Sequence, residues 1–365
     1  MANNCLVTKL KGAVDNSNLP LYGYIKVNVM YDPSVSTPQV INFLVDSQFM
    51  PDGLIVKSAG GNYIAATAEA LDTNPVNELT FGPGTQHVYF KNANYSILIS
   101  NKYSYINVIE SPSSILEVDL DEFKYMTGIG SLQTNDVHAK GDLGVLKDKL
   151  SNRLAVMDYG GTNLYGNVTG FANTLEYFQI QATAENTRVT GSVDSVFTGN
   201  QILRRLFLSN MKNVSGNIAL LSSPALTIAG LQNSGITGSI NSLYTNSNLE
   251  NLTLNKTGVS GDVTNAFTGL TKLTVLALEH CPNLTGNIDT MFKNIIQANP
   301  SVFKARTDTL RLGYRYSNGL TTTVLPANSL LSFAFTGTST VNIVNEETQE
   351  QIGTYNIDTN TFNIN

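Results

Sequence analysis

The sequence predicts a mainly β protein whose centre is a solenoid of short parallel strands. The first observation is a glycine, flanked by polar and branched residues, that returns at a nearly constant interval between residues 139 and 320. Successive glycines are 25, 25, 25, 22, 23 and 25 residues apart, and the seven copies are Gly141, Gly166, Gly191, Gly216, Gly238, Gly261 and Gly286. Self-similarity at such a period is the signature of stacked structural repeats.

The second observation is an apolar triplet, spaced i, i+3 and i+5, that lies between successive glycines. The last two members of each triplet alternate as in a short strand, with both side chains on one face. We therefore expect the strands to stack in parallel. The copies are Leu175/Phe178/Ile180, Leu203/Leu206/Leu208, Leu226/Ala229/Leu231, Leu249/Leu252/Leu254 and Leu273/Leu276/Leu278, with an earlier copy at Leu120/Phe123/Tyr125.

Composition is the third observation. The chain has 365 residues, 42% of them hydrophobic, which is enough for two or three packed units. A formal charge of -6 provides no basic field, so nucleic-acid binding is not expected. Only 14% of residues are charged, and such neutral polar surfaces are common in extracellular, cell-envelope and virion-surface proteins.

Residues 1–112 form the first predicted domain, which is β-rich and has no repeat. In residues 24–29, Ile25, Val27 and Val29 alternate with polar residues, as in a half-buried strand. Short strands separated by Gly and Pro turns predict a small sandwich or an open barrel, with further strands at residues 39–45, 53–57, 62–66, 87–91, 95–100 and 106–109. The opening stretch, residues 5–14, is either the first strand of this domain or an arm that docks on another subunit.

Residues 113–319 form the predicted solenoid, which begins with a cap at residues 113–120. Residues 320–365 form a short β module, in which Leu331, Phe333 and Phe335 alternate and residues 358–360 are the turn of a hairpin. After Gly286 the repeat is irregular, because residues 294–307 lack the triplet. We expect Leu310 and Leu312 to be a displaced final strand.

The repeats resemble the leucine-rich repeat family, in the variant that combines L-x-x-L-x-L with a L-[ST]-G-x-I turn. The resemblance covers roughly half of the chain. It implies repeats that bury their apolar faces only against neighbours, so that the ends need caps. The asparagine that closes the strand in this family is seen as Asn210, Asn233 and Asn255, and Ala229 replaces a leucine.

Catalytic and metal-binding patterns are weak throughout the chain. The three histidines, His87, His138 and His280, lie in different segments, and His280 beside Cys281 is best explained as a loop residue next to a buried cysteine. A polysaccharide depolymerase would need clustered carboxylates, but the candidates occupy unlike repeat positions: Asp158, Glu176, Glu185, Asp194 and Asp262. We therefore expect no enzyme activity, no cofactor and no metal site.

The family resemblance implies that a partner is bound through the variable residue inside each strand. In successive repeats this residue is Gln179, Phe207, Gly230, Thr253 and Ala277. We take Gln179, Phe207 and Thr253 as the candidate partner-binding residues, with a protein or a sugar as ligand; a purely structural solenoid is the alternative. The seven repeat glycines are assigned to tight turns.

The whole layout resembles virion proteins of phages that infect Bacteroidota, including the crAss-like phages. The opening MANNCLVTKLKG and the [ST]-G-[NSD]-[IV] repeats carry this resemblance. It implies a non-enzymatic virion structural protein, such as a head or tail fibre, an appendage or a capsid decoration. Such a subunit attaches through its N-terminal domain, binds other virion proteins and forms homo-oligomers.

The expected location is the virion, assembled in the host cytoplasm, because residues 1–9 do not resemble a secretion signal and no apolar run is long enough to span a membrane. The alternative is a bacterial cell-surface leucine-rich-repeat adhesin that binds a host protein or glycan. This alternative requires export.

Overall fold

The computed structural model describes residues 23–29, 39–45, 54–57, 63–66, 78–81, 84–90, 95–101, 116–121, 129–245 and 247–365. Its architecture is mainly β, as predicted, with a parallel-strand solenoid at its centre. The chain divides into two compact units: unit 1 is Met1–Leu175 with Gln179–Thr190, and unit 2 is Glu176–Phe178 with Gly191–Asn365. The three-part organisation into 1–112, 113–319 and 320–365 stays a prediction.

The early strands of unit 1 pair antiparallel in two groups. One group joins β4, β3, β6, β1 and β8, and the other joins β5, β2 and β7. Both groups end on the long strand β9, which pairs in parallel with β7 along its first half and with β8 along its second. The strands are β1 (Gly23–Val29), β2 (Gln39–Val45), β3 (Leu54–Lys57), β4 (Tyr63–Ala66), β5 (Glu78–Phe81), β6 (Gly84–Phe90), β7 (Tyr95–Asn101), β8 (Leu116–Asp119) and β9 (Ile129–Asp142).

Most strands predicted for this region occur close to their expected bounds, and β2 occupies the predicted residues. The strand β5 was not predicted. The predicted strand at 106–109, the opening arm at 5–14, and Phe123 and Tyr125 of the earliest triplet lie outside the described residues. Parallel stacking then begins within unit 1, where β9 also pairs with β10 (Leu150–Asp158) and β11 (Leu164–Asn167), and β11 pairs with β13 (Asn186–Ser192).

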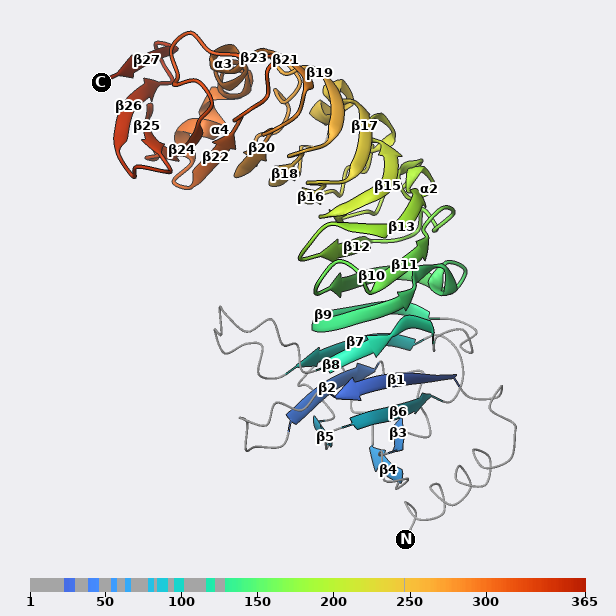
Figure 1. Cartoon of the computed structure of the whole chain (residues 1–365). Coiled ribbons are helices and arrows are strands. Elements are labelled where there is room, and N and C mark those ends of the chain that lie inside the picture. The colour runs from blue at the N-terminus through green and yellow to red at the C-terminus, as the bar shows by residue number, and fades with distance from the viewer. Residues whose placement is uncertain are drawn as a thin grey trace. The chain divides into compact units, whose positions relative to one another are not determined.

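In unit 2, two parallel ladders run on different sides of the coil (Figure 1). The first ladder contains β14 (Arg205–Phe207), β16 (Ile228–Gly230), β18 (Asn251–Thr253), β20 (Val275–Ala277) and β22 (Thr309–Gly313). The second contains β15 (Met211–Asn217), β17 (Gly235–Ser239), β19 (Gly258–Asp262), β21 (Asn283–Asn287) and β23 (Leu320–Thr321). Short helices follow two of the second-ladder strands: η6 (Ile218–Leu220) comes after β15 and η7 (Ile240–Thr245) after β17. The helix α2 (Asp194–Phe197) follows β13 in the same way.

The core of unit 2 is a column of leucines. In each turn the predicted triplet residues, such as Leu249, Leu252 and Leu254, are fully buried, and so is the branched residue that follows the motif glycine, such as Val263. A single turn could not enclose these side chains, because each is covered by the turns before and after it. Hydrophobic burial between neighbouring turns therefore stabilises the coil.

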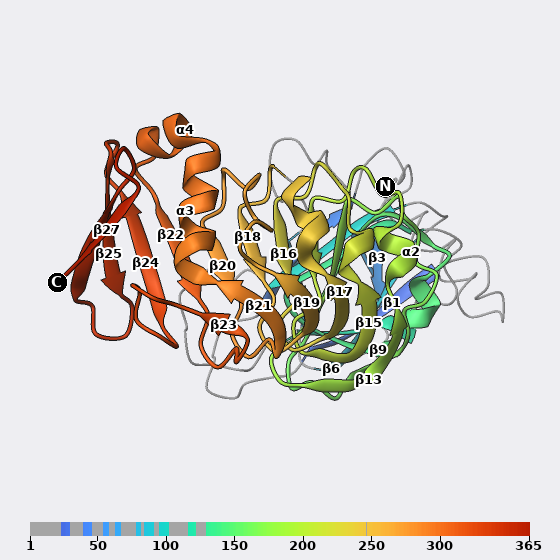
Figure 2. The ribbon, with the colours of Figure 1, turned by 90° about the horizontal axis from the view of Figure 1, so that it is seen from above.

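The C-terminal end of unit 2 is closed by antiparallel strands and two helices (Figure 2). The strand β22 pairs with β24 (Leu330–Phe335), followed in order by β25 (Thr340–Asn345), β26 (Gln351–Asn356) and β27 (Thr361–Ile364). The helix α3 (Ile288–Ala298) packs on this sheet, and its Phe292 ring stacks on Phe333 at 3.9 Å between centroids. The predicted hairpin and the displaced strand at Leu310 and Leu312 are confirmed, whereas α3 and α4 (Pro300–Ala305) were not predicted.

Among the described residues, no helix combines the length and the apolar composition needed to cross a membrane.

Candidate functional site

The first ladder of unit 2 presents an outward surface, which we call the strand face. It consists of three rows of side chains, because alternate residues of each strand point away from the leucine core. In the first row the residues in register are Arg205, Ile228, Asn251, Val275 and Arg311. The second row is Phe207, Gly230, Thr253, Ala277 and Gly313, and the third, just beyond the strands, is Ser209, Gln232, Asn255, Glu279 and Arg315.

The second row is small except at Phe207, and this lets large side chains lie across it. A Cβ at Gly230 would be 2.5 Å from Cδ1 of Phe207, so the aromatic ring lies over the glycine of the next strand. Gly230 is buried and Phe207 is half-buried, so the side of the ring away from Gly230 remains accessible. In the same way, the Glu279 carboxyl group lies over Gly313, where a Cβ would be 2.9 Å from Cδ of Glu279.

The side chains of the third row are polar, and only some of their hydrogen-bonding groups have partners. The Thr253 hydroxyl donates to Oε1 of Gln232 at 2.7 Å, and the Asn255 amide donates to Glu279. Two buried acceptors, Oγ of Ser209 and Oδ1 of Asn255, have no hydrogen-bond partner in the described part of the chain. A buried polar atom without a partner is costly, so these two atoms lower the stability of this row rather than offering an accessible contact.

Charge is confined to the ends of the strand face. Near β22, Arg315 donates to Glu279 at 3.0 Å and to Glu347, and hydrogen bonding to Glu279 raises the pKa of the Arg315 guanidinium. Arg311 lies 3.6 Å from the Glu346 carboxylate. Between these groups and Arg205 at the other end, the first two rows carry no ionisable side chain. The centre of the face is therefore neutral.

Each turn leaves this face through a residue in the left-handed backbone region. In successive turns these residues are Asn210, Asn233, Lys256, His280 and Tyr316, with φ between 52° and 63°. Asparagine tolerates this region best among residues with a side chain. The family-like asparagine of the third turn was therefore assigned one residue too early, at Asn255, because Lys256 occupies the equivalent position.

The backbone of these turns is held by the next turn, since the N–H of Asn210 donates to the Gln232 carbonyl at 3.0 Å and that of His280 to the Arg315 carbonyl at 2.9 Å. The rings of His280 and Tyr316 stack at 4.7 Å. His280 is therefore an exposed turn residue, as the sequence predicted.

Cys281 is buried beside this turn and has a structural environment. Its Sγ lies 3.0 Å from the Leu254 carbonyl, and burial raises the pKa of the thiol. The equivalent positions of neighbouring turns hold Ser234 and Thr257, whose hydroxyls also donate to a backbone carbonyl. A buried thiol with a raised pKa is a poor nucleophile.

Asp158, one of the candidate carboxylates, is fully buried in unit 1. Its carboxylate accepts hydrogen bonds from the backbone N–H groups of Asn163 and Leu164, at 2.9 and 3.0 Å. The side-chain amides of Asn163 and Asn186 donate to it as well. By accepting these four hydrogen bonds, the Asp158 carboxylate holds adjacent turns together.

The other candidate carboxylates are separated along the chain, and three of the four have their own partners. Glu176 pairs with Arg204 at 3.4 Å, and Glu185 is exposed on a turn. Asp194 accepts from the Asn217 backbone N–H at 2.7 Å, and Asp262 from that of Thr264 at 2.8 Å. The described residues hold no group of three or more His, Cys, Asp or Glu side chains placed to bind a metal ion.

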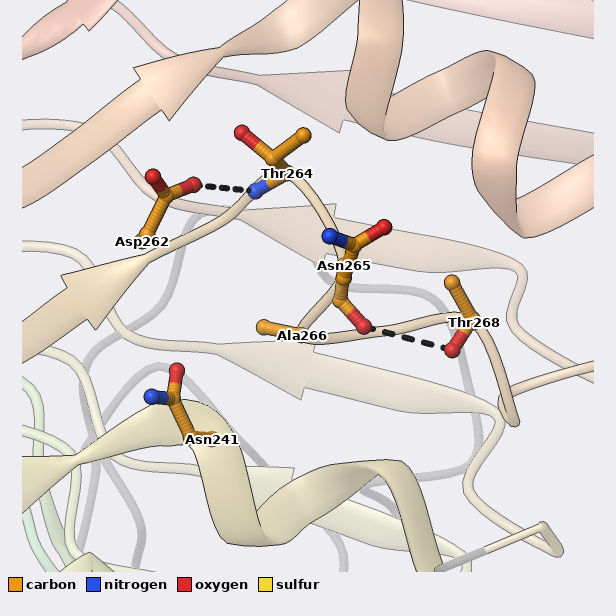
Figure 3. Close-up of a pocket in the computed structure, with 6 residues that line it drawn as sticks. All are labelled: Asn241, Asp262, Thr264, Asn265, Ala266 and Thr268. Carbon is orange, nitrogen blue, oxygen red and sulfur yellow. Dashed lines mark hydrogen bonds between the residues drawn. The ribbon is translucent and has the colours of Figure 1, made fainter.

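A shallow hollow of about 570 Å³ lies beside the second ladder of unit 2 (Figure 3). Within it, hydrogen bonds from Thr264 lower the pKa of Asp262, and the Asn294 amide donates to the Thr264 carbonyl at 2.9 Å. These contacts cap the turn and connect it to α3, so they leave no paired acid and base. The lining residues are Asn241, Asp262, Thr264, Asn265, Ala266 and Thr268.

Two of the three predicted partner-binding residues share the strand face. Phe207 and Thr253 lie in its second row with only Gly230 between them, whereas Gln179 lies on β12 (Tyr177–Ala182) and belongs to unit 1. Gln232, Asn251 and Asn255 also lie on this face but were not among the predicted partner-binding residues. Extending the strand alternation by two residues in each direction would have placed them on the same side.

Comparisons with known proteins assign no family to the chain. No protein-family model and no curated protein matches the chain. Solved structures that resemble it include a TDR receptor (14% identity, TM-score 0.28, 56% of this chain and 43% of the receptor covered) and the leucine-rich-repeat ectodomain of the Arabidopsis thaliana receptor kinase GASSHO1/SCHENGEN3 with CASPARIAN STRIP INTEGRITY FACTOR 2 (14%, 0.27, 55% and 31%).

A third is the plant peptide hormone receptor RGFR1 with RGF2 (12% identity, TM-score 0.29, 56% of this chain and 37% of the receptor covered). The chain spans less than half the length of each of these structures, and none of these values assigns it a ligand. With its parallel ladders and leucine core, unit 2 is a parallel-strand solenoid.

Proposed function

We propose that this protein is a non-catalytic binding scaffold, which uses the strand face of unit 2 to hold a macromolecular partner. The observation that carries the proposal is that Phe207, Asn251 and Gln232 are accessible on this face. Phe207 keeps apolar surface that no described residue covers, and Asn251 and Gln232 keep unused hydrogen-bonding groups. On the second ladder, polar side chains such as Asn217 and Asp262 are used to cap turns. Accessible side chains on a rigid parallel ladder are suited to recognition, because they lose little freedom on binding.

The test is to place an arginine in the centre of this face. The tagged full-length protein is used to recover partners from host lysate and from purified particles, and the affinity of the identified partner is then measured. We expect Asn251→Arg to weaken binding at least about tenfold, because it inserts a charge into a contact surface without a counter-charge. The matched variant, Thr237→Arg on the second ladder, leaves the affinity unchanged; the opposite pattern contradicts the proposal.

The finer proposal is that the partner belongs to a phage particle and that this chain is a virion structural protein. It rests on the opening MANNCLVTKLKG and on the [ST]-G-[NSD]-[IV] repeats. In this proposal the N-terminal region attaches, copies of the chain associate with one another, and the solenoid projects or bridges.

Mass spectrometry of purified particles and light scattering of the isolated chain test this assignment. We expect the protein in the particles, in many copies, and a homo-oligomer in solution. A monomer that is absent from particles but exposed on intact bacterial cells would instead favour the adhesin.

A further inference from the structure

We propose that the neutral centre of the strand face, formed by Phe207, Gln232, Asn251 and Thr253, is a binding site for an uncharged carbohydrate chain. The inference rests on the proposed function of this face and names the class of its ligand. The four residues come from the adjacent turns that contain β14, β16 and β18.

The aromatic ring provides the first element of this site. Because Gly230 has no side chain, Phe207 extends over it from the neighbouring strand, and the ring is held by the sheet below while its outer side stays accessible. Sugar rings present C–H groups with a partial positive charge on one side. The negative face of an aromatic ring attracts such groups, and an open sheet surface offers room for them.

Unused amide groups provide the second element. Oε1 of Gln232 accepts from Thr253 at 2.7 Å, which fixes the side chain and leaves its NH₂ group without a partner among the described residues. The side-chain amide of Asn251 is half-buried and also lacks a hydrogen-bond partner among the described residues. Adjacent hydroxyls of a sugar donate and accept at once, so they can satisfy amide donors and acceptors together.

The distribution of charge argues against an anionic chain as the ligand, and the backbone pairing of the strands argues against an extended peptide. The two cations of the first row, Arg205 and Arg311, are at its opposite ends, and Arg205 lies over the Tyr177 ring at 5.4 Å. Lys256 lies beyond the third row, in the turn that follows Asn255. An anionic chain would need cations along the centre, which the face does not provide. An extended peptide would bind most readily by adding a strand, but both sides of β16, β18 and β20 are already paired.

Affinity electrophoresis of the full-length protein tests the proposal. The gels contain laminarin, dextran, mannan or xyloglucan as neutral probes, and heparin or alginate as charged ones. We expect at least one neutral polysaccharide to retard the protein, with a dissociation constant on the order of 1 mM or lower. Phe207→Leu keeps an apolar cover over Gly230 but removes the ring, and it should weaken binding about tenfold.

Three further variants distinguish a direct effect on the binding site from an effect on folding. Phe207→Tyr keeps a ring and should retain binding, Gln232→Ala should weaken it, and Thr237→Val on the second ladder should have no effect. Circular dichroism and melting temperature confirm that each variant is folded.

Absence of retardation by every neutral probe overturns the carbohydrate assignment, and so does retardation that Phe207→Leu and Gln232→Ala leave unchanged. If a protein partner still binds in a way that Asn251→Arg disrupts, the proposed function stands and only the ligand class is wrong. If neither a neutral probe nor a protein partner depends on this face, both proposals fail.

Discussion

At the scale of single residues, the repeat motif is explained by contacts between one turn and the next. The polar residue after the motif glycine caps the turn or short helix that follows, as Oδ1 of Asn217 accepts from the Ala219 N–H at 3.0 Å and Oδ1 of Asp262 from the Thr264 N–H at 2.8 Å. The glycine of the next turn lies directly against that cap, since a Cβ at Gly238 would be 2.0 Å from Oδ1 of Asn217. The same relation joins Asp142 to Gly166 in unit 1. The motif glycine therefore makes room for the cap of the preceding turn.

Gly238 also has φ of +98°, a conformation that other residues rarely adopt. We expect Gly238→Ala to lower the free energy of unfolding by about 2 to 4 kcal/mol, from strain and from the contact with Asn217. Denaturant titration measures the loss. Gly258→Ala is the matched control, because a Cβ there meets only the end of a side chain at 3.0 Å, and it should cost less than about 1 kcal/mol.

The pair Asn217→Ala and Gly238→Ala checks the cause. If the cap and the glycine interact as described, the double variant is less destabilised than the sum of the two single changes. Additive losses would show that the two positions act independently.

At the scale of elements, the helix α3 and the strand β5 show which elements a sequence pattern can predict. The buried face of α3 follows a helical period: Ile288, Met291, Phe292, Ile295 and Ile296. This pattern is present in the sequence and indicates a helix, in a segment where the leucine triplet is absent. The strand β5 is only four residues long, and such short strands carry little periodicity.

Arg306 connects these helices to the last turns of the solenoid. Its guanidinium donates to the carbonyls of Leu273 at 2.8 Å and Thr271 at 3.3 Å, and it lies between the rings of Phe303 and Phe335 at 5.3 and 4.5 Å. Two carbonyls and two rings are therefore held by one side chain that is nearly buried.

We expect Arg306→Ala to lower the free energy of unfolding by roughly 2 to 3 kcal/mol, because it leaves carbonyl groups unpaired and removes cation–π contacts. Arg306→Lys should recover little, since an ammonium cannot donate in two directions from a planar group. Arg204→Ala is the control, because that side chain is 58% exposed and makes one ion pair at 3.4 Å. Equal losses in Arg306→Ala and Arg204→Ala would contradict the role assigned to Arg306.

At the scale of the whole molecule, each turn is stabilised mainly by the turns next to it. The structures that cover the ends therefore determine how well the terminal turns are protected from unfolding. In unit 2, β24 pairs with β22 and covers the edge that the last turn would otherwise expose. The buried rings of Phe333 and Tyr355 complete the cover.

We expect removal of residues 320–365 to destabilise the turns nearest this end first. Hydrogen exchange should show lost protection in β22 and β20, with β16 less affected, because repeats interact mainly with their neighbours. Removal of residues 357–365 alone takes away β27 and should have a smaller effect. Uniform loss of protection across unit 2 would instead indicate a single cooperative unit.

Taken by itself, the sequence determined the repeat period, the buried leucine column, the positions of Phe207 and Thr253 on the strands and the C-terminal hairpin. These features depend on the spacing of residues along the chain, and this spacing can be read from the sequence alone. Only the tertiary structure decided that Phe207 lies over Gly230, that Gln232 pairs with Thr253 and that Asn255 keeps an unpaired oxygen. The reason is that side-chain direction and hydrogen-bond pairing between turns depend on register, and register is set when the turns pack together.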